Sequence, residues 1–467
     1  MTPQAQDLPD EVLSEILCWL PKRDLQIARL VTTRWSRVGA RWLFHRVYFA
    51  PRRAAMDTFM KIASSPISGW NVRELVYDSR LFIPELVEHP ERYQRACREI
   101  AREDEHMDDF SETHHRTDAV IGHYSEAFVN SIIQYTRLSE QQEAIFENGK
   151  DYQALCTGLK KFQNISKVTI LDDFPDDAQS FSLLNPVEDG YAWYDHRSSM
   201  EIATALKPSD WSLIRPGFEF NFWAGRRRNA QLWDTRGITS LMQALASYCP
   251  RIEELQLGSA TSIAPIGIFG TTKQDIESAC EIAQRLTSLK LKVFPMGWLG
   301  AGEIYEEKSY DSLARILREA KSLYQLSIGG RIKLNGLGDQ HWPNLGLLTL
   351  GDLNLEAEEL LCLVKVHEGT LRGLTLRNVY LSGVEGWEEA GRRIGKHLKL
   401  HYLCVCSLAD EVTEHATHPP YIEDEVNVTL ARSLMQSVPE DTWGFEEEGA
   451  LTIAKVHGCP FKMQLEL

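Results

Sequence analysis

The sequence has no long hydrophobic run and no recognisable secretion signal. No apolar stretch approaches the roughly 18 residues needed to cross a bilayer, and residues 1–20 hold no basic segment followed by an apolar core. The nine cysteines are scattered without the spacing of a disulfide framework. We therefore expect a chain that makes no membrane contact and resides in the reducing environment of the cytoplasm or nucleus.

Motifs of common enzyme families are also missing. The sequence contains no phosphate loop, dinucleotide glycine pattern, Gly-x-Ser-x-Gly elbow or His-Glu-x-x-His zinc helix. His106, His114, His115 and His123 lie among acidic residues, but no cysteine accompanies them and their spacing fits no standard metal site. We therefore expect a protein that is not an enzyme and that holds no cofactor and no metal ion.

Positive charge is scarce relative to negative charge. Lys and Arg together number 50 against 66 Asp and Glu, so the net charge is −16 and the pI is about 5.4. This excess opposes binding to nucleic acid and to anionic membranes. Composition is otherwise ordinary for a globular protein, with 43% hydrophobic and 25% charged residues. A chain of 467 residues corresponds to about three domains, or to fewer if a repeat array occupies much of it.

The first amphipathic pattern lies at the N-terminus. Pro9 suits the first turn of a helix, where no backbone N–H is required, and Asp7 is in place to cap that helix. Pro21 then ends the helix, because proline cannot continue the hydrogen-bond ladder. The apolar positions follow the 3.6-residue period and form one stripe: Leu8, Val12, Leu13, Ile16, Leu17 and Leu20.

Two further short helices are expected within the first fifty residues. Asp24 can cap the second helix, and Thr32 or Thr33 can cap the third. The third helix carries apolar residues at intervals of three and four. Three helices of this size bury too little surface to be stable alone. We therefore predict that this segment needs a partner.

These N-terminal residues resemble an F-box. The resemblance covers residues 7–49 and rests on Leu8-Pro9 with Glu11-Val12-Leu13, on Leu-Pro-Lys-Arg-Asp-Leu at 20–25 and on Arg-Leu-Val-Thr-Thr-Arg-Trp at 29–35, although serine is commoner in the family where Thr32-Thr33 stands. F-box proteins bind the Skp adaptor of Skp, cullin, F-box ubiquitin ligases and carry a substrate-binding module downstream. The resemblance implies that the following residues make or support the adaptor contact: Leu8, Pro9, Val12, Leu13, Ile16, Leu17, Leu20, Leu25, Val31 and Trp35.

A second pattern recurs from residue 152 to residue 405. Each copy has a helical apolar face followed by a short strand in which apolar residues alternate. One strand is expected at Lys167–Leu171, and the strand leucines at 255, 289, 326, 348, 374 and 403 follow at steps of 34, 37, 22, 26 and 29 residues. A single helix and strand leave their apolar faces uncovered, so the copies must stack, with parallel strands inside and helices outside.

These copies resemble irregular leucine-rich repeats. The shortest steps lie within or near the period of about 20–29 residues of such repeats, although the asparagine expected after each strand has possible counterparts only in Asn354 and Asn378. The resemblance implies an α/β fold, with a three-helix F-box before a leucine-rich-repeat-like solenoid. The predicted parts are the F-box at 1–50, a linker and candidate first repeat at 51–83, a charged helical insertion at 84–150, the array at 151–408 with a loop insertion at 172–235, and a C-terminal cap and tail at 409–467.

The expected function follows from the two resemblances. The F-box would bind the Skp adaptor and through it a cullin, while the array would hold a protein substrate. The chain would then be the non-catalytic substrate-recognition subunit of an E3 ubiquitin ligase. The alternative is a repeat scaffold that binds the adaptor for assembly or transport without ubiquitylation.

Overall fold

The computed structural model describes residues 8–79, 81–82, 126–171, 214–215, 236–257, 264–265, 272–294, 303–330, 340–382, 387–406, 409–410, 434–435, 443–448 and 451–456. The four histidines between residues 106 and 123 lie outside these ranges, as does most of the predicted insertion at 172–235. The chain divides into two compact units. Unit 1 comprises residues 1–220 and 232–249, and unit 2 comprises residues 221–231 and 250–467. The domain boundaries drawn from the sequence stay predictions.

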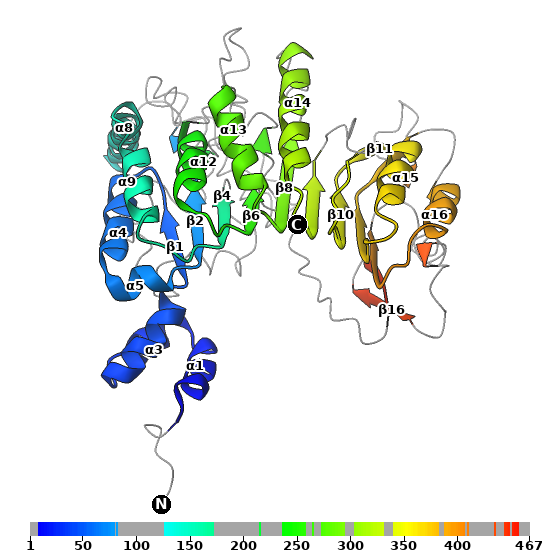
Figure 1. Ribbon diagram of the computed structural model, residues 1–467. Helices are drawn as coiled ribbons and strands as arrows, with labels where there is room; N and C mark the ends of the chain where they lie inside the picture. Colours follow the sequence, from blue (N-terminus) through cyan, green and yellow to red (C-terminus); the bar gives the residue numbers. More distant parts are fainter. Residues whose placement is uncertain are drawn as a thin grey trace, which may run out of the picture. The chain divides into compact units, whose positions relative to one another are not determined.

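The N-terminal part of unit 1 folds as three short helices (Figure 1). They are α1 (Asp10–Cys18), α2 (Lys22–Ala28) and α3 (Thr33–Leu43). Thr32 caps α3, because its Oγ1 accepts a hydrogen bond from the backbone N–H of Trp35 at 3.1 Å. Of the two threonines considered from the sequence, Thr32 is therefore the cap.

The starts of α1 and α2 differ from the prediction. Pro9 and Pro21 occupy the N-cap positions, with ψ of 155° and 149°, and neither helix has a side-chain cap. Proline suits this position because the N-cap backbone is extended and its N–H is not required. Asp24 is not a cap but lies in the first turn of α2, where a carboxylate interacts favourably with the helix dipole. Asp7 lies outside the described residues.

The rest of unit 1 is a parallel sheet with helices packed on it. The strand order is β1-β2-β4, with Val47 opposite Leu75. Phe49 stacks on Tyr77 and meets Phe59 of α4 edge-on, so aromatic rings form this core. The elements are β1 (Arg46–Phe49), α4 (Arg53–Ser64), α5 (Pro66–Asn71), β2 (Glu74–Asp78), α8 (Glu126–Glu147), α9 (Lys150–Leu159), β4 (Lys167–Leu171) and α12 (Arg236–Tyr248), with β3 (Leu81–Phe82) and β5 (Ile214–Arg215) as a separate antiparallel pair.

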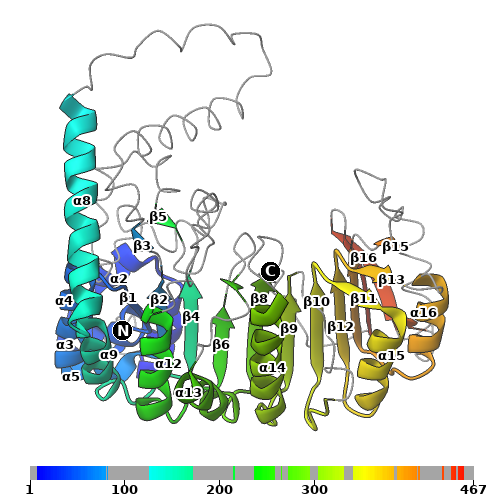
Figure 2. The same ribbon diagram turned by 90° about the horizontal axis from the view of Figure 1, so that it is seen from above.

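Unit 2 contains a longer parallel sheet. Its strand order is β6-β8-β9-β10-β12-β14, and β17 and β16 extend it as antiparallel strands. Helices α13, α14 and α15 lie on one side of these strands (Figures 1 and 2). The helices are α13 (Lys273–Ala283), α14 (Glu303–Glu319), α15 (Ala357–Val366) and α16 (Trp387–Gly395). The strands are β6 (Glu254–Leu257), β7 (Ala264–Pro265), β8 (Ser288–Phe294), β9 (Gln325–Gly329), β10 (Leu347–Gly351), β12 (Gly373–Arg377), β14 (Tyr402–Cys406), β16 (Trp443–Glu448) and β17 (Leu451–Val456), and a second sheet holds β11 (Asn354–Glu356), β13 (Tyr380–Ser382) and β15 (Ala409–Asp410).

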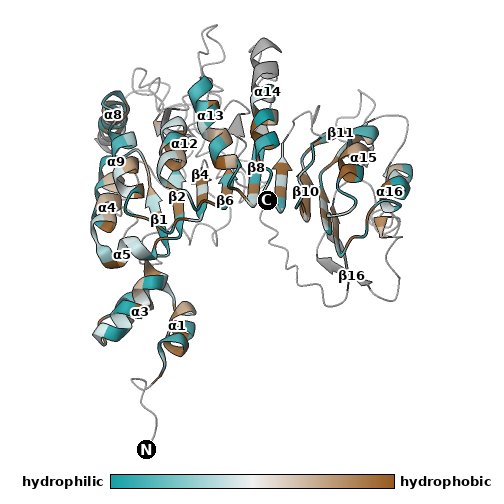
Figure 3. Cartoon of the chain, in the orientation of Figure 1, coloured by the Kyte–Doolittle hydropathy of each residue, from teal (hydrophilic) through white to brown (hydrophobic). Residues whose placement is uncertain are grey.

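Alternate side chains of the unit 2 strands form its core. Leu289, Leu326, Leu348 and Leu374 lie in register on neighbouring strands and are at most 2% exposed. Figure 3 shows the alternation as hydrophobic and hydrophilic bands along these strands. All seven strands predicted from the recurring pattern form, β4 in unit 1 and six in unit 2. The structure thus confirms the α/β class with a large parallel sheet and helices.

One interval of the recurring pattern is described only in part. A helix precedes six of the seven strands, but residues 340–346, the described part of the segment before β10, form no helix. Trp342 fills the space there: it is 1% exposed, and its indole N–H donates to the carbonyl of Leu317 at 2.9 Å. Residues 331–339 lie outside the described residues, so the prediction of a helix in this interval stays a prediction. In the described stretch, a buried tryptophan lies against the end of α14.

The turn after three successive strands of unit 2 uses a left-handed backbone. Gly330, Asp352 and Asn378 each follow the last residue of their strand and have φ of 105°, 53° and 51°. Aspartate and asparagine tolerate this conformation better than most residues. Asn378 also donates its side-chain amide to Asp352 Oδ1 at 2.9 Å, which links two consecutive turns. Asn378, one of the two asparagines singled out from the sequence, thus lies at a structural turn, whereas Asn354 begins β11.

Candidate protein-interaction site

The three N-terminal helices share a small hydrophobic core. Leu13 and Leu17 of α1 are fully buried, and Leu25 and Ala28 of α2 complete the buried cluster. The partly buried side chains packed against it are Leu20, Trp35, Val38 and Trp42. The cluster consists of residues from these helices and the turn between them, so one side of α1 is covered by its neighbours within the N-terminal segment.

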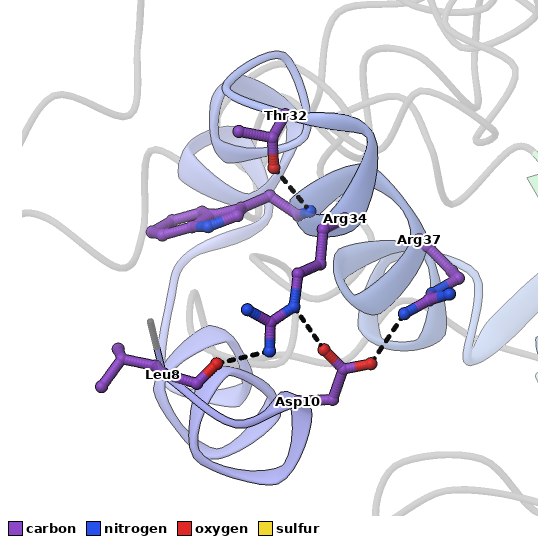
Figure 4. Close-up of polar contacts among 6 residues, drawn as sticks. Leu8, Asp10, Thr32, Arg34 and Arg37 are labelled. Atoms are coloured by element: carbon purple, nitrogen blue, oxygen red, sulfur yellow. Dashed lines mark hydrogen bonds and ion pairs between the residues drawn. The ribbon is translucent and has the colours of Figure 1, made fainter. Parts of the chain in front are cut away.

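Polar contacts fix α1 against α3 (Figure 4). The carboxylate of Asp10 accepts hydrogen bonds from Arg34 Nε at 2.6 Å and from Arg37 Nη2 at 2.8 Å. Arg34 also donates to the backbone carbonyl of Leu8. The hydrogen bond from Arg34 lowers the pKa of Asp10, with further lowering by the positive charges of both arginines. Further along α1, Trp42 Nε1 donates to Ser14 Oγ at 3.0 Å.

The same segment also exposes large apolar side chains. Val12 and Ile16 of α1 and its C-cap residue Trp19 follow the spacing i, i+4 and i+7, which places them on one stripe. Trp19 is 84% exposed, and Leu30 in the turn after α2 is 85% exposed. We call the six exposed side chains of this segment the apolar face: Val12, Ile16, Trp19, Ile27, Leu30 and Val31. Figure 3 shows hydrophobic residues on α1 in brown.

The structure divides the residues named from the sequence into three groups. Pro9, Val12, Ile16 and Val31 are exposed and accessible to a partner. Leu13, Leu17 and Leu25 are buried in the core of the three helices, so they can support a contact only by holding the helices together. The residues of intermediate exposure are Leu8, Leu20 and Trp35.

Three members of the apolar face were not named from the sequence. They are Trp19, Ile27 and Leu30. Trp19 lies seven residues after Val12, so the helical period offered a signal for it. No periodic signal separates Ile27 and Leu30 from their buried neighbours Leu25 and Ala28, because α2 is only seven residues long and apolar on several sides.

The described residues contain no sign of a metal site or a membrane span. Within the ranges given above, no group of three or more His, Cys, Asp or Glu side chains is placed to hold a metal ion. In the same ranges, no helix has the length and apolar character needed to cross a bilayer. Six cysteines among the described residues are free thiols, of which Cys18 and Cys362 are exposed.

Comparison with known proteins agrees with the geometry of the N-terminal segment. The F-box-like family model matches residues 5–50, which include all three helices and the whole apolar face. No curated protein sequence matches the chain. The N-terminal segment of this chain is therefore an F-box-like domain.

Proposed function

We propose that this chain is the non-catalytic substrate-recognition subunit of a Skp, cullin, F-box type E3 ubiquitin ligase. The observation that carries the proposal is the exposed apolar face of an F-box-like domain, since F-box domains generally bind a Skp adaptor. Exposing six large apolar side chains of one small domain to water is costly, and apolar side chains left exposed in this number are typical of a protein that binds a partner. Trp19 is the proposed central anchor, because interface energy concentrates in a few large side chains.

The stacked strands and helices of unit 2 are the proposed substrate-binding part. We interpret them as irregular leucine-rich repeats, on the basis of the recurring strands and the left-handed turns at Asp352 and Asn378. Stacked repeats offer an extended strand surface for a macromolecule. Holding a substrate lysine beside a loaded conjugating enzyme would accelerate ubiquitin transfer by proximity, without a catalytic residue in this chain.

Adaptor capture by the full-length chain tests the proposal. Ile16→Asp and Trp19→Asp place a charge on the apolar face at side chains that are 43% and 84% exposed, so folding should be retained. We expect each to reduce co-purification of a Skp adaptor about tenfold or more. Val366→Asp on α15, where the side chain is 38% exposed, is the matched control and should leave recovery unchanged. Recovery of the adaptor at the unaltered level with both face variants would refute the assignment.

A second measurement separates the ligase from the alternative scaffold. Both functions require the adaptor, but only the ligase requires a cullin in the same complex and ubiquitin transfer to a bound partner. Reconstitution of the chain with adaptor, cullin and conjugating enzyme should give both. A stable adaptor complex that excludes the cullin would favour the scaffold.

A further inference from the structure

The segment from residue 25 to residue 73 is basic, although the chain as a whole is acidic. Asp57 is its only acid, against nine cations, while the whole chain has a net charge of −16. Acidic side chains outside this segment form ion pairs with four of the cations: Arg34, Arg37, Arg46 and Arg52. Within the described residues, the other five form no ion pair: Arg29, Arg41, Arg53, Lys61 and Arg73. Positive charge is therefore in excess in the first part of unit 1.

Helix α5, which lies in this basic segment, exposes two large apolar side chains. Ile67 is 58% exposed and Trp70 is 59% exposed, and their spacing of three residues places both on one side of the helix. Ser68 and Gly69 are the buried residues of α5, and a Cβ on Gly69 would lie 3.6 Å from the ring of Phe162. The small residues thus face the core of unit 1, and the two large apolar side chains remain in water.

The ends of α3 and α5 meet at His45. Helix α5 packs against α3 (Figure 1), and the backbone N–H groups of Arg73 and Glu74 donate to the carbonyl of His45 at 2.8 and 3.0 Å. Partial burial lowers the pKa of His45, and the positive charges of Arg73 and Arg41 lower it further, so both arginines lie near this ring. Glu74 is 5% exposed and already forms ion pairs. We call four exposed residues at this meeting point the junction patch: Arg41, Ile67, Trp70 and Arg73.

The two arginines of the junction patch contact only neutral groups among the described residues. The guanidinium of Arg41 lies 5.7 Å from the centre of the Trp42 ring. Arg73 Nη1 donates to the backbone carbonyl of Asn164 at 3.5 Å. Such contacts orient a guanidinium without neutralising it, and a guanidinium binds carboxylates through strong charge-assisted hydrogen bonds. The patch therefore combines two available positive charges with two exposed apolar side chains.

We propose that the junction patch is a second contact site for the Skp adaptor, which would bind it through an acidic segment that also carries an apolar side chain. The inference rests on the proposed function, because it extends the adaptor contact beyond the apolar face. Leu30 and Val31 of that face directly precede α3, and His45 of the junction follows it. The eleven residues of α3 span about 16 Å, whereas a typical partner surface of about 800 Å² is roughly 30 Å across. One adaptor molecule of ordinary interface size is therefore large enough to reach both ends of α3.

The chemistry of the junction patch favours a protein over a nucleic acid. Aromatic residues and arginine are the side chains enriched in protein interfaces. A nucleic acid carries phosphates over its whole length, and the net charge of −16 would repel it beyond the patch. A short acidic segment experiences mainly the charge within a Debye length of about 10 Å, so the local excess of arginine is sufficient to attract it.

Titration of the full-length chain with a purified Skp adaptor tests the inference. Trp70→Asp should raise the Kd about tenfold or more, because it removes an apolar anchor and adds a like charge for an acidic partner. Val366→Asp on α15 is its matched control and should leave the Kd unchanged. Thermal unfolding of each variant checks that folding is retained.

The role of charge is measured by association kinetics. The double variant Arg41→Gln with Arg73→Gln should slow association with the adaptor about threefold or more at low ionic strength, and added salt should reduce the difference. Replacing both arginines by lysine keeps the charge and should retain most of the rate. The matched control is Arg315→Gln with Arg318→Gln, two exposed arginines of α14, and it should associate like the unaltered chain.

Photo-crosslinking identifies the molecule that occupies the patch. Ile67 is replaced by benzoylphenylalanine, which keeps an apolar side chain at this exposed position, and the adaptor complex is irradiated and digested. We expect a cross-link to an adaptor peptide that contains several aspartates or glutamates. A cross-link to an adaptor peptide without acidic residues, or to a second copy of this chain, would overturn the inference.

Further outcomes separate the inference from the proposed function. Ile16→Asp is measured on the same day: loss of adaptor binding in this variant, with unaltered binding in Trp70→Asp and in the double arginine variant, would overturn the inference and leave the proposed function intact. An unaltered chain that binds no adaptor would overturn both. Binding of an RNA of about 20 nucleotides that is lost in the double arginine variant, while adaptor binding is unchanged, would assign the patch to a nucleic acid instead.

Discussion

Arg34 Nε donates to Asp10 Oδ1 at 2.6 Å, so that the first turn of α1 is joined to the start of α3 across 24 residues of sequence. Together with the bond from Trp42 to Ser14 at 3.0 Å, this contact attaches α1 to α3 at two points along its length. Rotation of α1 about its axis would break both bonds. The stripe of Val12, Ile16 and Trp19 is therefore held away from the domain core, where a partner can reach it.

Removing the charge of Asp10 should loosen α1. We expect Asp10→Asn to accelerate amide hydrogen exchange in α1 and to weaken adaptor binding less than Ile16→Asp does, because the apolar face stays intact. The folded-state pKa of Asp10 is lowered, so its stabilising contribution is present above its ordinary value of 3.8 and is lost as the pH falls through the lower folded value. Glu15→Gln, an exposed carboxyl on α1, is the control; equal exchange in both variants would contradict the prediction.

Truncation of Leu13 should mainly lower stability, whereas truncation of Ile16 should mainly weaken adaptor binding. Leu13 is fully buried, so Leu13→Ala should lower the free energy of unfolding of the F-box-like domain by about 2–5 kcal/mol. Ile16→Ala removes a side chain that is 43% exposed and should cost much less stability while still weakening adaptor binding. Hydrogen exchange of α1 and α3 measures the first effect, and adaptor titration measures the second. Similar stability losses in the two variants would contradict the burial of Leu13 and the exposure of Ile16 on α1.

His367 should make unit 2 sensitive to acid. It is 1% exposed, its Nε2 accepts from the backbone N–H of Trp342 at 3.0 Å, and its Nδ1 donates to the carbonyl of Leu363 at 2.8 Å. Burial lowers its pKa from the ordinary value of 6.5, with a smaller lowering from the nearby His341. The unfolded chain therefore binds the proton first, so stability falls as the pH drops below 6.5 towards the folded pKa.

Urea unfolding of unit 2 at a series of pH values measures this effect. His367→Gln should reduce the loss of stability below pH 6.5, although the variant is expected to be less stable at neutral pH because the fit around Trp342 is disturbed. His341→Gln changes an exposed ring and should keep most of the pH dependence. An unchanged pH dependence in His367→Gln would assign the effect to other groups.

Gly158 should not tolerate a methyl group. A Cβ at this position of α9 would overlap the ring of Phe59, which is fully buried between Phe49 and Phe162 and cannot move aside. We expect Gly158→Ala to lower the stability of unit 1 by about 1–3 kcal/mol. Gly369→Ala, where no atom lies within 4 Å of the new Cβ, is the control. Thermal unfolding with equal midpoints for the two variants would contradict the close packing of α4 on α9.

Much of the fold was predictable from local pattern. The strands β4, β6, β8, β9, β10, β12 and β14 lie where alternating apolar residues predicted them, because in-register burial on one face requires a period of two. The capping of α3 was likewise readable from the threonine pair at 32 and 33. The burial of Trp342 before β10 was not predictable in the same way, since it depends on a contact with Leu317, 25 residues earlier.

The sequence by itself determined the class of the protein, since helical and strand periods, threonine capping and the resemblance to an F-box are all local properties of the chain. Only the tertiary structure decided which apolar residues of the N-terminal helices are available to a partner. Leu13 and Ile16 occupy the same predicted stripe, yet Leu13 is fully buried and Ile16 is 43% exposed. The physical reason is that burial depends on how α2 and α3 pack against α1, through contacts such as that of Arg34 with Asp10, and no periodicity within a single helix specifies that packing.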